Sequence, residues 1–437
     1  MNSSYFISSP VERLQGDITV PGDKSISHRA IMLGSIAKGI TTVHGFLDGE
    51  DCLATINAFK KMGVRIDGPV SQRVTIHGVG KHGLKKPDTA LDCGNSGTTM
   101  RLLAGLLAAQ SFDCELTGDE SLLRRPMERI SIPLSEMGAQ LSTTAGRPPL
   151  FIHGGQTLHG IRYEMPVASA QVKSCVLLAG LYAKGDTQVI EPKPTRDHTE
   201  RMLTAFAYPI QKTGDVISIN ANSECLGTDV TVPGDISSAA FFMVAATIIP
   251  GSALIIRNVG VNPTRIGLIH ILNRMGAHID LINQRICGGE LVADISVKHA
   301  PLKGIDIPAE WVPLAIDEFP VLFIAASCAK GQTTLYGAKE LRSKESDRIA
   351  AMVDGLQSLG IDAEALDDGI IIQGGVLKGG VVDSQHDHRI AMAFSIAGSV
   401  ASAPVTILHC ANVATSFPTF VHTANQVKLA IQETRDE

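Results

Sequence analysis

Six segments of the chain are apolar around nearly their whole circumference, and they recur roughly every 70 residues. A helix without a polar face is a buried helix, so each segment is predicted to lie in the interior of the protein. Several of them end in Lys-Gly, Pro-Gly or Gly-Ser, which are typical helix-stop pairs. The segments are residues 30–39, 101–110, 173–185, 239–251, 319–331 and 389–399.

A second, amphipathic type of helix alternates with the first. Four copies run into a glycine that leads to a strand, and this glycine is expected at the left-handed position that ends a helix. The four are Gly63, Gly138, Gly276 and Gly360. A fifth copy, residues 198–211, has Tyr-Pro where the glycine is expected, and a truncated sixth begins at Phe417. Alternating runs between the helices, such as residues 73–78 and 216–220, predict strands.

The stretch Thr-Val-Pro-Gly-Asp occurs twice, at residues 19–23 and 231–235, and each copy opens a set of three helix pairs. The pattern therefore predicts an α/β protein of two globules, each built from three repeated units. We expect domain I to comprise residues 1–20 plus 235–437, and domain II residues 21–234. The crossovers are expected near residues 20–22 and 232–235. The alternative is a single large sheet, but a parallel doubly wound sheet would not need the repeated strand-Gly-strand hairpins.

Composition excludes several classes of protein. The chain has 437 residues, of which 44% are apolar and 19% charged, and its net charge is −6. This length favours two or three domains, and the acidic balance with only 4% aromatic residues argues against a nucleic-acid partner. The apolar run from Ile390 contains Pro404 and many small residues, so a buried helix followed by a strand is expected rather than a membrane span.

The N-terminal sequence and the cysteines point to the cytoplasm. The first residues lack the basic-then-apolar layout of a signal peptide. The eight cysteines show no Cys-x-x-Cys spacing, and several fall in apolar helices. We therefore expect reduced, buried thiols in a cytoplasmic protein.

Charged and glycine-containing residues gather where the buried helices begin. Lys24, Ser25, His28 and Arg29 precede the first, residues 94–101 the second and 169–174 the third. A helix N-terminus has unpaired N–H groups and a partial positive charge, so it favours anions. Several such ends, joined by Arg101 and Arg389, predict a site for small polyanions.

Further cations and acids occur in the turns. The cations are Arg124, Arg125, Arg196, Lys344 and Arg348, and the acids that could move protons are Asp317, Glu345 and Asp387, the last beside His388. Arginine binds planar carboxylate and phosphate groups through two hydrogen bonds. Taken singly, each motif is also an ordinary structural element: a Gly-rich turn with a Ser cap, or a solvated helix face. A polyanion-binding site is favoured only because these motifs recur at the same position of the repeat, where the buried helices begin.

Seven ordered motifs resemble the 5-enolpyruvylshikimate-3-phosphate (EPSP) synthases, a family of enolpyruvyl transferases. They are PGDKSISHRA, GNSGTTMRLLAG, RRPM, SAQVKS, RDHTERM, KESDR and DHRIAMAF, and they span nearly the whole chain. The resemblance implies an inside-out α/β barrel of two globules, each of three βαββαβ units, with the site between them. It also implies transfer of the enolpyruvyl group of phosphoenolpyruvate to the 5-hydroxyl of shikimate 3-phosphate, with release of phosphate, in the shikimate pathway to aromatic amino acids.

The resemblance also assigns roles by motif. Asp317, Glu345 and Lys24 are the candidates for catalysis. The residues implied for shikimate 3-phosphate are Lys24, Ser25, Arg29, Ser169, Ala170, Gln171, Arg196, Asp317 and Lys344. Those implied for phosphoenolpyruvate are Lys24, Asn95, Gly97, Arg125, Gln171, Arg348 and Arg389. No cofactor, metal, nucleic acid or membrane is implied, and a monomer is expected.

Three positions depart from the better-known bacterial pattern and are similar to the second sequence class of the family. Ala170 replaces a second serine, the turn at Arg196 to His198 replaces a Lys-Pro-Tyr version, and Thr415 stands where a lysine is expected. Two rivals are open: the sister enzyme acting on UDP-N-acetylglucosamine, and a non-catalytic phosphosugar-binding protein. The first would need a loop cysteine beside arginine, and the second leaves Asp317 and Glu345 unexplained.

Overall fold

The computed structural model describes residues 4–435, and within them the chain divides into two compact units. Unit 1 comprises the residues up to Pro21 together with those from Pro233 onward, and unit 2 comprises Gly22–Val232. Each unit has its own hydrophobic core. The boundaries lie within two residues of the crossovers expected from the repeated Thr-Val-Pro-Gly-Asp stretch.

Unit 2 contains the following elements in chain order: α1 (Lys24–Ile36), β3 (Lys38–His44), α2 (Glu50–Lys61), β4 (Arg65–Val70), β5 (Arg73–Val79), β6 (Leu91–Asp92), α3 (Gly97–Leu107), β7 (Cys114–Thr117), α4 (Glu120–Leu123), α5 (Glu128–Glu136), β8 (Gln140–Thr144), β9 (Arg147–His153), β10 (Arg162–Glu164), α6 (Ala170–Gly180), β11 (Asp186–Ile190), α7 (His198–Ala205), β12 (Gln211–Thr213), β13 (Val216–Asn220) and β14 (Asp229–Thr231).

Unit 1 begins with β1 (Ser4–Ser9) and β2 (Gln15–Thr19) and resumes after unit 2. The later elements are α8 (Ile236–Ile248), β15 (Ala253–Gly260), α9 (Gly267–Met275), β16 (His278–Cys287), β17 (Glu290–Lys298), α10 (Phe319–Ser327), β18 (Gln332–Leu335), the 3-10 helix η1 (Lys339–Ser343), α11 (Arg348–Ser358), β19 (Asp362–Leu366), β20 (Gly369–Gln373), β21 (Gly380–Asp383), α12 (His388–Gly398), β22 (Val405–Leu408), the 3-10 helix η2 (Cys410–Thr415), α13 (Phe420–Gln426) and β23 (Ala430–Arg435).

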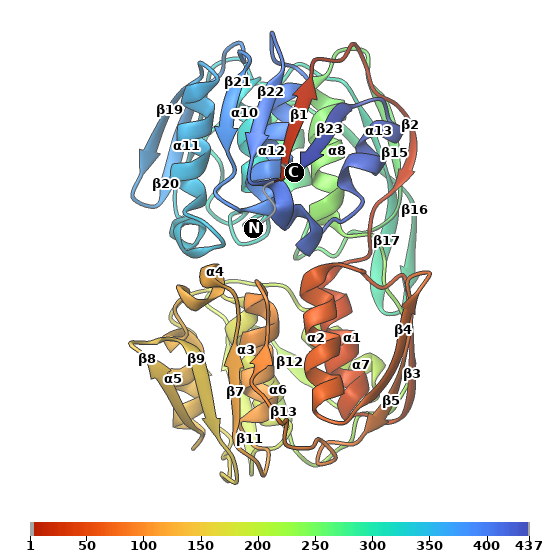
Figure 1. The fold of residues 1–437 in the computed structure, drawn as a ribbon, viewed down its shortest axis with the longest axis vertical. Helices are drawn as coiled ribbons and strands as arrows, with labels where there is room; N and C mark the ends of the chain where they lie inside the picture. Colours follow the sequence, from red (N-terminus) through yellow and green to blue (C-terminus); the bar gives the residue numbers. More distant parts are fainter. Residues whose placement is uncertain (1–3, 436–437) are drawn as a thin grey trace. The chain divides into compact units, whose positions relative to one another are not determined.

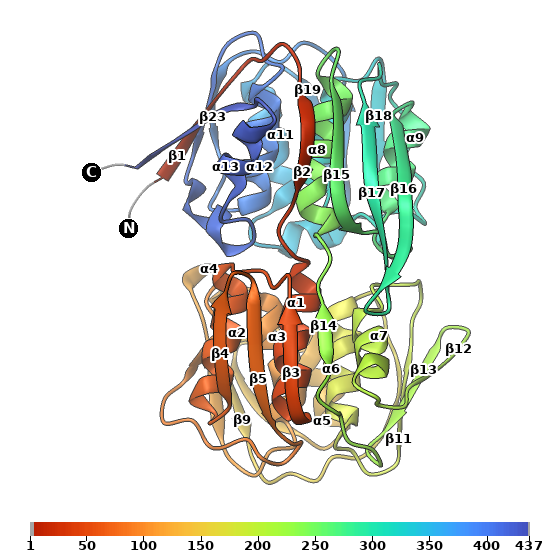
Figure 2. The same cartoon turned by 90° about the vertical axis from the view of Figure 1, so that its right-hand side faces the viewer.

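The strands of residues 4–435 form six sheets, three in each unit, and they repeat one topology. In five sheets a parallel pair is followed by two antiparallel neighbours, as in the order β14-β3-β5-β4. The sixth, β18-β20-β19, has a single parallel bridge between Asp306 and Thr334 in place of its fourth strand. The predicted six-unit α/β fold is confirmed. Figure 2 shows the order β2-β15-β17-β16 in unit 1 and β4-β5-β3-β14 in unit 2.

The six all-apolar segments form the inner helices. In unit 2, α3 contacts both α1 and α6, and in unit 1 the helices α8, α10 and α12 contact one another (Figure 1). Their residues are buried almost throughout. The strands alternate buried and exposed positions, as in β9, so each sheet covers helices with one face and exposes the other. Helices inside and sheets outside are the arrangement of an inside-out barrel.

The N-terminal strands belong to sheets of unit 1. Strand β1 pairs antiparallel with both β22 and β23, and β2 pairs parallel with β15. In Figure 1 the red β1 lies between the blue β22 and β23. The first and last strands of the described chain are therefore neighbours in one sheet.

The two Pro-Gly-Asp turns share a structural role. Asp23 caps α1 by accepting a hydrogen bond from Ile26 N at 2.9 Å, and Asp235 caps α8 by accepting one from Ser237 N at 2.9 Å. Gly22 allows a close approach, since a Cβ there would lie 1.9 Å from the carbonyl oxygen of Gly45. The second turn is charged as well, because Asp235 pairs with the buried Arg265 at 3.1 Å.

The covering helices end as predicted at four glycines, Gly63, Gly138, Gly276 and Gly360, whose φ angles lie between +81° and +104°. In the fifth copy the expected position was wrong. Ala207, rather than the Tyr-Pro after it, takes the left-handed conformation with φ +57°. Lys428 does the same after α13, with φ +71°. The conformation is thus retained in all six copies, although two of them lack glycine.

Candidate active site

Three inner helices of unit 2 begin at one end of that unit. Helices α1, α3 and α6 start at Lys24, Gly97 and Ala170, and the side chains of Asp23, Ser96 and Ser169 cap them. Gln171, on α6, joins two of these starts. It accepts a hydrogen bond from Arg101 Nη1 at 2.5 Å and donates one to Thr98 Oγ1 at 3.1 Å. The ends of α3 and α6 that favour anions are therefore fixed beside each other.

Gly97 lies between two guanidinium groups. A Cβ on this residue would be 3.1 Å from Nη1 of Arg101 and 3.1 Å from Nη1 of Arg125. Arg125 is oriented by Asn95, whose Oδ1 accepts from Arg125 Nη2 at 2.9 Å, and Asn95 in turn donates to Asp119 at 2.7 Å. Two buried arginines beside the first turn of α3 make an arrangement suited to a phosphate or carboxylate.

Lys24 and Arg29 occupy the first turns of α1. Lys24 forms an ion pair with the buried Asp51, and its side chain is 17% exposed. Arg29 is nearly buried. Its Nη1 donates to the carbonyl of Ser25 at 2.9 Å, its Nε to Thr199 at 2.7 Å and its Nη2 to Ser174 at 2.8 Å. These contacts connect α1 with α6 and α7.

His28, between these cations, is fully buried. Burial, together with the charges of Lys24 and Arg29, lowers the pKa of its imidazole well below the usual value. The ring is therefore neutral at pH 7. Its Nδ1 lies 2.8 Å from Thr55 Oγ1, and that hydroxyl lies 2.8 Å from Thr99 Oγ1. His28 thus joins the hydrogen bonds among α1, α2 and α3.

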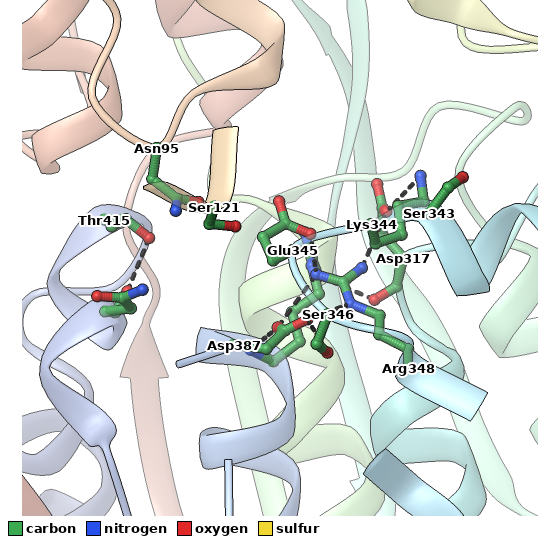
Figure 3. A network of polar contacts seen from close by, with 12 residues as sticks. Asn95, Ser121, Asp317, Ser343, Lys344, Glu345, Ser346, Arg348, Asp387 and Thr415 are labelled. Atoms are coloured by element: carbon green, nitrogen blue, oxygen red, sulfur yellow. Dashed lines mark hydrogen bonds and ion pairs between the residues drawn. The ribbon is translucent and has the colours of Figure 1, made fainter. Parts of the chain in front are cut away.

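Unit 1 holds a cluster of acids and bases around Arg348 (Figure 3). Asp317, just before α10, lies 3.3 Å from Lys344 Nζ and 3.5 Å from Arg348 Nη1. Glu345 accepts from Arg348 Nη2 at 2.6 Å. Lys344 also pairs with Glu340 at 3.0 Å. The two candidate proton-transfer acids, Asp317 and Glu345, are thus attached to the same guanidinium.

Asp387, directly before α12, also binds Arg348. It accepts from Arg348 Nε at 2.8 Å and caps α12 through Arg389 N at 2.9 Å. Burial alone would raise the pKa of the Asp387 carboxyl, but the Arg348 charge outweighs it and lowers the pKa below its usual value. Burial would likewise lower the pKa of Arg348, and Asp387, Glu345 and Asp317 raise it instead. Asp387 and Arg348 form a fully buried, ionised pair that supports the half-buried Asp317 and Glu345. Asp387 is therefore no candidate for moving protons.

The remaining predicted residues of unit 1 lie on α12 and η2. Arg389 Nη1 donates to the main-chain carbonyl of Asp317 at 3.0 Å, which brings α12 and the start of α10 together. Thr415 is nearly buried and donates to the carbonyl of Asn412 at 2.7 Å. The hydroxyl of Thr415 is thus used within η2, where the resemblance had suggested a lysine.

Comparisons with known proteins identify the family of this chain. Residues 8–424 match the family model for EPSP synthase (3-phosphoshikimate 1-carboxyvinyltransferase). The chain belongs to the EPSP synthase family.

Similar proteins cover nearly the full length. A 3-phosphoshikimate 1-carboxyvinyltransferase of Legionella pneumophila is 66% identical over 428 residues, covering 98% of this chain and 99% of the relative. The one from Methylococcus capsulatus is 60% identical, with 98% of each chain covered. The solved EPSP synthase of Acinetobacter baumannii is 56% identical with a TM-score of 0.87, covering 99% of this chain and all of that one.

The EPSP synthase residues predicted from motifs fall into two groups by unit. Unit 2 holds Lys24, Ser25, Arg29, Asn95, Gly97, Arg125, Ser169, Ala170, Gln171 and Arg196, and unit 1 holds Asp317, Lys344, Glu345, Arg348 and Arg389. Within unit 2 the contacts above join most of them, while Arg196 is half-buried in the turn before α7.

Sequence reasoning missed the partners of these residues. Asp51 pairs with Lys24, Asp119 supports Asn95, and Thr199 binds Arg29. A capping pattern before α4 could have indicated Asp119, whose side chain accepts from Leu122 N. The other two are separated from their partners by long stretches of chain, so no local pattern marks them.

Residues 4–435 contain no group of three or more histidine, cysteine, aspartate or glutamate side chains placed to hold a metal ion. Among their helices, none is long and apolar enough to span a membrane.

Proposed function

We propose that the two groups of residues act on the same two substrates in the EPSP synthase reaction. The reaction itself follows from family membership: the chain transfers the enolpyruvyl group of phosphoenolpyruvate to the 5-hydroxyl of shikimate 3-phosphate and releases phosphate. The observation that carries the residue assignment is the link of Arg101, Gln171 and Thr98, which fixes two helix N-termini side by side.

Shikimate 3-phosphate is assigned to the start of α6 and the cations near it. Ser169, Ala170 and Gln171 offer the helix end, while Lys24, Ser25, Arg29 and Arg196 supply charge and a hydroxyl. Asp317 and Lys344 complete the set from unit 1. The support is that Arg29 is held rigidly by Thr199 and Ser174, as a preorganised binding group should be.

Phosphoenolpyruvate is assigned to the start of α3. Asn95, Gly97 and Arg125 would face its phosphate together with Lys24 and Gln171, and Arg348 and Arg389 its carboxylate. Among the described residues Arg348 Nη1 makes no hydrogen bond, although Asp317 lies 3.5 Å away. A substrate carboxylate could therefore bind this nitrogen in place of the longer ion pair.

The chemistry requires a proton to be added to the enol methylene and one to be removed from the attacking hydroxyl. Addition gives a tetrahedral intermediate, and loss of phosphate together with a proton from its methyl group then restores the double bond as an enol ether. Asp317, Glu345 and Lys24 are the groups proposed to move these protons. Each lies beside groups of opposite charge, which favour its ionised form: Lys344 and Arg348 for Asp317, Arg348 for Glu345, and Asp51 for Lys24.

Phosphate release with shikimate 3-phosphate and phosphoenolpyruvate tests the assignment. Asp317→Asn and Glu345→Gln should each reduce kcat at least about a hundredfold, since general acid–base catalysis contributes about 10²–10⁴-fold. Glu364→Gln, at an exposed position on β19, is the matched control and should retain activity. Full activity in both site variants would exclude these acids from the chemistry.

The same assay distinguishes the rival functions. Turnover with UDP-N-acetylglucosamine in place of shikimate 3-phosphate would indicate the sister enzyme. Binding without turnover would indicate a phosphosugar-binding protein.

We also propose a cytoplasmic monomer. Light scattering at micromolar concentration should give the mass of one chain, 46.3 kDa.

A further inference from the structure

Lys173, in the first turns of α6, is the most deeply buried cation of unit 2. Its side chain is 0% exposed, and its Nζ lies 2.9 Å from Glu191 and 2.7 Å from Glu200. Both carboxylates are themselves nearly buried. Burying three charges brings a large desolvation cost, and well-packed apolar residues are often as stable. Stability alone therefore gives no reason for this cluster.

Lys173 and Glu191 hold the turn that precedes Arg196 through hydrogen bonds to Thr195. Glu191 follows β11, and its Oε1 accepts from Thr195 N at 3.1 Å and also from the Thr195 hydroxyl. Lys173 Nζ reaches the carbonyl of Thr195 at 3.5 Å. Residues 191–195 are thus folded over the ammonium group, and Arg196 is the next residue along the chain.

A second contact lies beside the first. Ser174 and Thr199, the sequence neighbours of Lys173 and Glu200, have their hydroxyls 2.8 Å apart. Both hydroxyls accept hydrogen bonds from Arg29, at 2.8 and 2.7 Å. Helices α6 and α7 are therefore joined by two contacts. The Lys173–Glu200 ion pair lies beside the turn before Arg196. The hydroxyls of Ser174 and Thr199 contact each other and bind Arg29.

We propose that Lys173, with Glu191 and Glu200, is a positioning residue for shikimate 3-phosphate. It fixes Arg196 and Arg29 relative to the start of α6, where Ser169 and Gln171 lie. Lys173 is fully buried, so it acts through these groups and does not touch the substrate. The inference rests on the proposed function, since it assumes that these groups bind shikimate 3-phosphate.

Steady-state kinetics of Lys173→Met test the proposal. The KM for shikimate 3-phosphate should rise at least about tenfold, because small misplacements of binding groups cost this much or more. The KM for phosphoenolpyruvate should change less than about threefold, since the groups at the start of α3 do not depend on Lys173.

Lys81→Met is the matched control. Lys81 is also a buried lysine of unit 2, but it donates to the carbonyls of Leu181 and Ala221, at the opposite end of α6. Its loss should lower the melting temperature without changing the KM for shikimate 3-phosphate. If both lysine variants raise that KM equally, or if Lys173→Met leaves it unchanged, the positioning role is wrong.

Lys173→Met could leave two buried carboxylates unpaired and fail to fold. A triple variant, Lys173→Met with Glu191→Gln and Glu200→Gln, removes all three charges and should fold, because no unpaired charge is left buried. Its KM for shikimate 3-phosphate should also be raised selectively, and a value equal to the wild type would overturn the proposal. Absence of turnover in the wild-type protein would instead refute the proposed function.

Discussion

At Gly97, the first residue of α3, a single added methyl group should weaken the binding of phosphoenolpyruvate. Gly97→Ala would place Cβ 3.1 Å from the guanidinium nitrogens of Arg101 and Arg125, which is tighter than an ordinary contact. Both side chains must then shift by a few tenths of an ångström. We expect the KM for phosphoenolpyruvate to rise about tenfold, with little change for shikimate 3-phosphate.

The control for this variant is another glycine with room for a side chain. At Gly375 the nearest atom to an added Cβ is Ile361 Cδ1 at 3.4 Å, an ordinary contact, so Gly375→Ala should leave both KM values unchanged. An equal rise in both KM values for Gly97→Ala would show a general distortion of unit 2 rather than a local effect on one substrate.

Asp294, on β17, should make unit 1 sensitive to acid. Burial alone would raise the pKa of its carboxyl, but hydrogen bonds from Asn283, the backbone of Asn258 and Arg257 lower it to about 2. The unfolded value is about 3.9. The stabilisation is therefore fully present above that value and is lost as the pH falls through about 2.

Thermal unfolding of Asp294→Asn at several pH values measures this contribution. The variant should melt below the wild type at pH 6, and the difference should shrink toward pH 3 as the wild type loses the stabilisation. Asp280→Asn, an exposed carboxylate on the neighbouring β16, controls for the change in net charge. A melting difference that stays constant from pH 6 to pH 3 would refute the mechanism.

At the residue scale, the sequence identified the cations but not their partners. Lys24 and Arg29 stand out because they lie at the start of a buried helix, and Arg348 because it lies in a charged turn motif. Their partners Asp51, Thr199 and Asp387 come from other elements. Three carboxylates, those of Asp317, Glu345 and Asp387, surround Arg348. Such pairings depend on tertiary contacts, which residue order alone does not specify.

The covering helices provide a test of how strongly their shared end depends on glycine. Gly276 follows α9 with φ +104°, and the nearest atom to an added Cβ is 3.5 Å away. Gly276→Ala therefore isolates the backbone cost, and should lower the free energy of unfolding of unit 1 by about 1–2 kcal/mol.

The reverse change should stabilise unit 2. Ala207→Gly relieves the left-handed strain after α7, and part of this gain is offset by the greater freedom of glycine in the unfolded chain. We expect a gain of up to about 1 kcal/mol in chemical denaturation. A loss of stability in Ala207→Gly would show that contacts of the Ala207 methyl matter more than backbone strain.

At the element scale, hydrophobic periodicity predicted the inner and covering helices but not where they begin. Helix α1 starts at Lys24 and α3 at Gly97, ahead of the apolar residues that marked them. Their first turns contain polar side chains that are buried through hydrogen bonds, such as those of His28 and Thr99. Apolar character cannot indicate a buried position of this kind.

Unit 2 should fold on its own because its three sheets and its core lie within one continuous stretch. A fragment of residues 22–232 should unfold cooperatively and bind shikimate 3-phosphate more weakly than the full chain, without turnover, since Asp317 and Lys344 lie in unit 1. Circular dichroism and titration calorimetry measure these properties.

A shorter fragment serves as the control. Residues 22–200 lack β12, β13 and β14, and so leave two sheets incomplete. This fragment should show no cooperative transition. If residues 22–232 also fail to melt cooperatively, unit 2 depends on the rest of the chain for its stability.

At the scale of the whole molecule, the sequence predicted two globules because internal repetition marks them. The repeated Pro-Gly-Asp turn revealed where the chain crosses, since Asp23 and Asp235 cap corresponding helices. The second turn lacks the Lys24, His28 and Arg29 that follow the first, yet its Asp235 pairs with Arg265. That arginine is contributed by a different element, so the turn itself gives no sign of it.

The place of β1 between β22 and β23 has a consequence for protein synthesis. The ribosome makes β1 before unit 2 and its two partners after it. Unit 2 can fold as it emerges, whereas β1 and β2 must wait, with unpaired backbone groups that invite wrong pairing. Unit 1 can close only after β23 has been made. Translation pauses or chaperones acting near the C-terminal end of the message should therefore affect the yield of folded protein more than those acting within unit 2.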